Sequence, residues 1–145
     1  MTKRYLISFL FIAIAVILGI VFYSNITFPE SNIEFFKAEQ YNQFAPIALC
    51  IELLIAGFYL FKKHPKTNFT LALFGFTAIL DPIFDLIGLF DSLVPLYGTV
   101  IFIICAPIAL WLAFTNTFGL GKITFLNTLL SFLSGCAIEL FFNYF

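Results

Sequence analysis

The chain has 145 residues, of which 62% are hydrophobic and 20% aromatic, while only 10% are charged. Seven basic and eight acidic side chains are too few to cover the apolar surface of a soluble domain of this length, so the composition indicates an integral membrane protein. The formal net charge of -1 and the scattered basic residues exclude a nucleic-acid-binding protein, because polyanion binding needs a dense basic face.

Five segments are long enough to cross a hydrocarbon core of about 30 Å, which takes about 20 helical residues. Their ranges are 5–23, 45–61, 69–90, 93–114 and 123–144. The first resembles a signal peptide, but its apolar run of about 19 residues lacks a small-x-small cleavage site, and we expect it to be retained. The sequence therefore predicts one all-α transmembrane domain of five helices over residues 1–145.

Basic residues indicate the orientation of these helices. If the helices alternate in direction, one side of the membrane receives Lys3, Arg4, Lys62, Lys63, Lys66 and Lys122. The positive-inside rule makes that side the cytoplasm, so we expect a cytoplasmic N-terminus and a C-terminus outside. We expect the protein in the cytoplasmic (inner) membrane of a bacterium.

One long connection, residues 24–44, would lie on the outer side. Within it, Ser31 and Glu34 have the spacing of a capping box, and Ile33 and Phe36 then share a face with further aromatic residues. This pattern predicts a short helix lying in the outer interface. Two interpretations stay open, a surface strap and a lid over a site below it.

Four carboxyl side chains, Glu52, Asp81, Asp85 and Glu139, lie inside apolar stretches that contain no Lys, Arg or His. An acid at this depth is costly, so each is a candidate for binding a proton, a cation or another ligand. Counted from the outer helix ends, Glu52 and Asp81 lie roughly 12 and 14 Å deep, and Asp85 and Glu139 about 8 Å. Because all four fall in the outer half of the bilayer, they predict a shared cavity that opens outward.

The acids also belong to polar stripes with a spacing of four residues, which places their members on one side of a helix. The fifth helix carries Asn127, Ser131, Gly135, Glu139 and Asn143 in this spacing, and the third carries Thr77, Asp81 and Asp85. We therefore add Asn127, Ser131 and Thr77 to the four acids as candidate ligand-binding or cation-binding residues.

Two prolines lie within predicted helices and are candidate hinges. Pro82 removes the hydrogen bond to the carbonyl of Ala78, which predicts either a kink or two half-helices in the third segment. In the second case Asp81 would be an N-cap, and Asp85 would be the stronger functional candidate. Pro107 is the corresponding candidate in the fourth segment.

Motifs for other chemistry are not present in the sequence. His64 is the only histidine and falls in a basic loop, which excludes bis-histidine haem and histidine-rich zinc sites. Cys50, Cys105 and Cys136 lie in three different helices without paired spacing, so we expect apolar packing rather than redox chemistry. No cofactor and no metal centre is predicted.

Three functions remain compatible with these observations. The first is a transporter or binding protein for a proton, a cation or a small cationic or amphipathic molecule, working as a homo-oligomer because five helices make a thin pathway. The second is a membrane-embedded isomerase or cyclase that uses a carboxylic acid and a carboxylate on an apolar lipid or isoprenoid. The third is an immunity or assembly subunit without chemistry of its own. Whether the protein is an enzyme is left open, and transport or binding ranks first.

Overall fold

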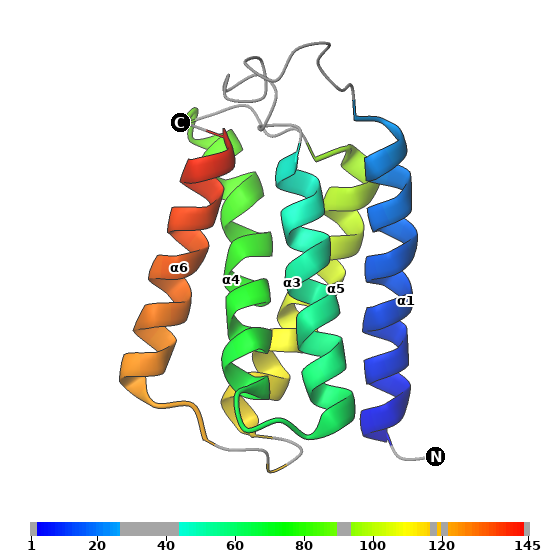
Figure 1. Ribbon diagram of the computed structural model, residues 1–145. Coiled ribbons are helices and arrows are strands. Elements are labelled where there is room, and N and C mark those ends of the chain that lie inside the picture. Colours follow the sequence, from blue (N-terminus) through cyan, green and yellow to red (C-terminus); the bar gives the residue numbers. More distant parts are fainter. Residues whose placement is uncertain (1–2, 27–43, 90–93, 117–118, 120–121, 144–145) are drawn as a thin grey trace, which may run out of the picture.

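The computed structural model describes residues 3–26, 44–89, 94–116, 119 and 122–143. These residues form α-helices and no strand, and Figure 1 shows the helices side by side, running alternately up and down. The helices are α1 (Lys3–Ser24), α3 (Ala45–Lys62), α4 (Thr67–Leu86), α5 (Leu96–Thr115) and α6 (Phe125–Asn143).

The prediction of an all-helical chain with membrane-type helices is confirmed. Among the described residues, α1, α3, α4 and α5 are long and apolar enough to cross a membrane, whereas the apolar part of α6, Phe125–Phe141, is shorter. The short helix predicted in the connection 24–44 falls on residues 27–43, which lie outside the described ranges.

Local sequence explains where two of the helices differ from their predicted ranges. We predicted a helix over 69–90, but α4 ends at Leu86 because Gly88 takes a positive φ of 82°, a conformation that closes a helix. We predicted the next helix from residue 93, but α5 starts at Leu96 because Pro95 is extended and serves as its N-cap. Both differences arise from the backbone conformation of a glycine or a proline at the helix end, which hydrophobicity does not reveal.

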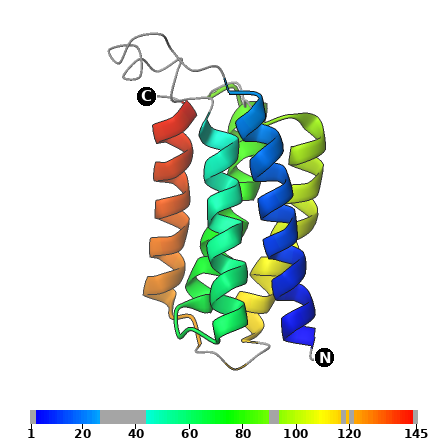
Figure 2. The ribbon, with the colours of Figure 1, turned by 45° about the vertical axis from the view of Figure 1, so that its right-hand side comes forward.

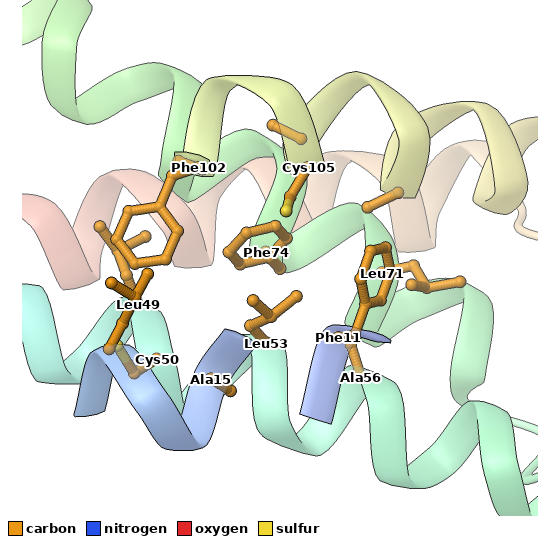
Figure 3. Packing of buried hydrophobic residues seen from close by; sticks show 14 of the residues in the cluster. Phe11, Ala15, Leu49, Cys50, Leu53, Ala56, Leu71, Phe74, Phe102 and Cys105 are labelled. Carbon is orange, nitrogen blue, oxygen red and sulfur yellow. The ribbon is translucent and has the colours of Figure 1, made fainter. Parts of the chain in front are cut away.

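The hydrophobic core lies between α1, α3, α4 and α5. Phe11, Leu53, Phe74 and Phe102, one from each of these helices, are all buried there (Figure 3). No described residue of α6 belongs to this core. Instead α6 packs along α4, with a smaller contact to α3, and stands at one edge of the bundle (Figure 2).

Glycines allow two pairs of helices to approach closely. A Cβ added to Gly57 of α3 would lie 2.9 Å from Cγ1 of Ile12 in α1. A Cβ on Gly75 of α4 would lie 2.5 Å from Cγ of Leu110 in α5. Small residues at such positions let two backbones come together, which supplies van der Waals packing that lipid cannot supply.

One end of the bundle carries all the described basic residues. α1, α4 and α6 begin at this end, and α3 and α5 finish there (Figure 1). We call it the basic end, because it holds Lys3, Arg4, Lys62, Lys63, Lys66 and Lys122. The clustering expected from alternating helices is therefore present in the fold, while which side of a membrane this end faces remains a prediction.

Arg4 has a structural role that its charge alone did not reveal. Its side chain is 6% exposed, and Nη1 donates to the carbonyls of Leu60 and Phe61 at 2.6 and 2.7 Å. Its guanidinium also lies over the ring of Tyr5, 4.1 Å from the centroid. A cation that binds the last carbonyls of a helix stabilises the negative end of its dipole, so Arg4 joins α1 to the end of α3.

Candidate functional site

Three buried acids meet where α3, α4 and α6 come together. Glu52 of α3 is 8% exposed, while Asp81 of α4 and Glu139 of α6 are 2% exposed each. Thr77 of α4, fully buried, completes the group. We call these four residues the acid cluster.

The fold positions the acid cluster through one face of α4 and one face of α6. On α6, Ser131, Gly135 and Glu139 are buried at intervals of four residues, as expected for the side that faces α4. A Cβ on Gly135 would lie 3.0 Å from Oγ1 of Thr77. The small glycine thus lets α6 approach α4 and brings Glu139, one turn further on, against Asp81.

Glu139 and Asp81 form a side-chain hydrogen bond, and Glu139 also interacts electrostatically with Glu52. An ionised carboxylate has only acceptors, so a hydrogen bond between two carboxyl groups requires a proton on one of them. The pair therefore holds at least one proton, as expected where two carboxyl groups lie too close for both to ionise.

Thr77 supplies a second side-chain hydrogen bond in the acid cluster, to Glu52. Its Oγ1 lies 2.8 Å from the carbonyl oxygen of Leu73, to which it donates, and 3.3 Å from Oε1 of Glu52. The hydroxyl has one proton, which the shorter bond to Leu73 and the longer bond to Glu52 share, and Thr77 is the donor in both. The other oxygen of Glu52, Oε2, is buried without a hydrogen-bond partner among the described residues.

No described basic side chain lies in the acid cluster. Arg4 binds carbonyls at the end of α3, and Leu60 lies about 12 Å along that helix from Glu52 at 1.5 Å per residue. Within the described ranges, no group of three or more His, Cys, Asp or Glu side chains is arranged to hold a metal ion. A proton therefore accounts for the contacts of the acid cluster without an internal counter-ion.

The structure separates the other predicted site residues from the acid cluster. Asp85 is exposed in the last turn of α4, because each step of four residues turns the helix about 40° past a full circle, so a stripe drifts around it. Ser131 is buried, but its Oγ donates to the carbonyl of Thr128 at 2.7 Å in its own helix. Asn127 lies toward the basic end and lines a separate pocket.

Both candidate hinges lie inside continuous helices, since α4 runs through Pro82 and α5 through Pro107. The alternative of two half-helices in the third segment is wrong, and Asp81 is not an N-cap. Pro82 is near the end of α4, so its missing N–H removes one hydrogen bond without dividing the helix. Asp81 is left with the contact to Glu139 as its described role.

Three pockets on the described residues lie outside the acid cluster. Two are apolar grooves of about 410 and 350 Å³ along α1 and α3, and the third, of about 290 Å³, lies at the basic end between α4 and α6. None is lined by Glu52, Asp81 or Glu139. The outward-opening cavity thus stays a prediction. The pocket at the basic end was not predicted from the sequence, although Lys66 and Lys122, which line it, are an indication of an anion site.

Fold and site together define an all-helical protein of membrane type that holds three carboxyl groups in its interior. Comparison of the chain with protein-family models, curated proteins and solved structures found no match.

Proposed function

We propose that this protein binds and transfers protons in a membrane, with the acid cluster as its proton site. One observation carries the proposal: the hydrogen bond between the buried carboxyl groups of Glu139 and Asp81. Such a bond needs a proton, and the surrounding interior offers no described cation to replace it.

The position of the acid cluster suggests the side from which protons arrive. Asp81 lies five residues before the last residue of α4, and Glu139 four before the last of α6, which is about 6 to 8 Å from the bundle end opposite the basic end. Protons would enter from that end, reach the Glu139–Asp81 pair and pass to Glu52. Thr77 would position Glu52 by donating a hydrogen bond to its Oε1.

A second candidate function uses the same contact. Polar groups buried between membrane helices also strengthen helix association, so the Glu139–Asp81 bond favours a role in attaching α6 to α4. In that case the protein is an assembly or immunity subunit and transfers no protons. The two functions differ in whether the proton exchanges.

Proton flux into liposomes tests the first function. Protein reconstituted with a pH-sensitive dye inside should carry protons down an imposed gradient. Glu139→Gln and Asp81→Asn should each reduce the flux at least tenfold, because an amide accepts no exchangeable proton in this role but still hydrogen-bonds to its neighbour. Retained helicity and thermal unfolding of both variants would show that the bundle is intact.

Asp85→Asn is the matched control. It removes a carboxyl group from the same helix one turn away, at an exposed position, and should leave the flux unchanged. Equal flux in all variants, or none in the unaltered protein, would contradict proton transfer. The infrared C=O band of protonated carboxylic acids would then distinguish a fixed structural proton from an exchanging one, because only an exchanging proton leaves as the pH rises.

A further inference from the structure

The pocket at the basic end has the chemistry of an anion site with an apolar wall. It lies between the first turn of α4 and the start of α6, and its volume is about 290 Å³. Lys66 and Lys122, far apart in the sequence, both line it. In Figure 1 the starts of α4 and α6 lie at the same end of the bundle.

Among the described residues, two lysines and no acidic side chain line this pocket. The eight acidic residues are Glu30, Glu34, Glu39, Glu52, Asp81, Asp85, Asp91 and Glu139, and none belongs to the connections that hold Lys66 and Lys122. The pocket also meets the N-terminal turn of α4, where the helix dipole is positive. No described acidic side chain supplies an anion at this position, so an anion from outside would meet the two lysines directly.

Two other basic side chains at this end, Arg4 and Lys62, have contacts within the protein. Arg4 binds the carbonyls that end α3, and Lys62 lies 5.9 Å from the ring centroids of both Phe58 and Phe61. Lys66 and Lys122 instead share the pocket. The two lysines are thus placed to bind one ligand together.

The remaining lining of the pocket is amphipathic. Asn127 adds an amide group near the lysines, and Phe69 and Leu130 add apolar surface. Asn68 also lines the pocket, and its amide donates to Asn116 at 2.9 Å. A phosphate group suits the lysines and the amide of Asn127, while a hydrocarbon chain suits the apolar side. Both groups occur together in a phospholipid, and a helix end of a membrane bundle lies at headgroup depth.

We propose that the pocket formed by Lys66, Lys122, Asn68, Asn127, Phe69 and Leu130 binds the headgroup phosphate of an anionic phospholipid, with an acyl chain along Phe69 and Leu130. This site is separate from the acid cluster and does not depend on proton transfer. It gives the basic end a specific lipid partner in addition to general attraction to an anionic membrane.

Native mass spectrometry of the full chain tests the lipid site. Protein is released from bilayers of equal parts phosphatidylglycerol and phosphatidylcholine, and retained lipid is counted. The unaltered protein should keep phosphatidylglycerol preferentially. The double variant K66Q/K122Q should lose about 30-fold in retention, at roughly fivefold per lysine. K66R/K122R should retain the lipid, because the charge remains.

K62Q/K63Q is the control, since it removes the same charge from the same end but from residues outside the pocket. Retention in this control with loss in K66Q/K122Q supports the proposal. An equal loss in both would mean general charge attraction only, and no loss in either would mean no site; both results overturn the proposal. Displacement of the lipid by millimolar inorganic phosphate or glycerol phosphate would also overturn it, because the pocket would then be a site for free anions.

Discussion

Arg4 shows how one side chain can connect two helices at their ends. In the sequence Arg4 is one more positive charge at the cytoplasmic side expected for the N-terminus, and its burial could not be inferred because the carbonyls it binds belong to residues more than fifty positions away. The three acids of the cluster were visible in the sequence as unpaired charges in apolar runs. Which of the four candidates meet could not be seen, because that depends on the phase of each helix.

Replacing Arg4 should destabilise the bundle. Arg4→Met removes two hydrogen bonds to the carbonyls of Leu60 and Phe61 and leaves those acceptors buried, which should lower the free energy of unfolding by about 2 kcal/mol. Denaturant titration in detergent measures this change. Lys3→Met is the control, because it removes the same charge one residue earlier at an exposed position. A similar loss in both variants would show that only charge at this end matters.

The sequence predicted which face of α6 is buried but not where α6 lies in the bundle. Its stripe of Ser131, Gly135 and Glu139 correctly predicted a buried face, and the structure directs that face at α4. That α6 stays outside the main hydrophobic core was not predictable, because its outward residues are as apolar as those of the core helices. Hydrophobicity identifies a membrane helix but not its neighbours.

Gly135 should be sensitive to a single methyl group. In Gly135→Ala the new Cβ would lie 3.0 Å from Oγ1 and 3.3 Å from the backbone nitrogen of Thr77, so α6 must shift outward. Overpacking of this kind costs about 1 to 3 kcal/mol and should also weaken the Glu139–Asp81 bond. We expect a lower unfolding temperature together with reduced proton flux.

Gly19→Ala is the matched control for this prediction. Its Cβ would lie 3.8 Å from Cβ of Cys50, an ordinary contact, in another membrane helix. This variant should unfold at or above the temperature of the unaltered protein, because alanine favours the helix more than glycine does. If both variants behaved alike, close packing at Gly135 would not be the reason for the loss.

Charged residues are distributed unevenly along the length of the bundle. The described basic residues lie at one end, and the acid cluster lies nearer the other end. The sequence predicted this division because short connections force neighbouring helices to alternate. The positive-inside rule predicts that the basic end faces the cytoplasm.

Cysteine labelling in intact cells tests the predicted orientation. The three native cysteines are replaced by alanine, and one cysteine is introduced at exposed Lys62 at the basic end or at exposed Asn25 at the other end. A membrane-impermeant thiol reagent should label Asn25→Cys in intact cells and Lys62→Cys only after lysis. The reverse pattern would place the N-terminus outside.

The packing of α6 against α4 depends on protonation. The bond between Glu139 and Asp81 exists only while at least one of the two acids carries a proton, and if both were ionised two like charges would face each other across the main contact of α6. Binding energies at linked sites are reciprocal. A force, a lipid or a partner that displaces α6 should therefore change the proton affinity of the Glu139–Asp81 pair. In the same way, a change of pH should change the strength of the packing of α6 against α4.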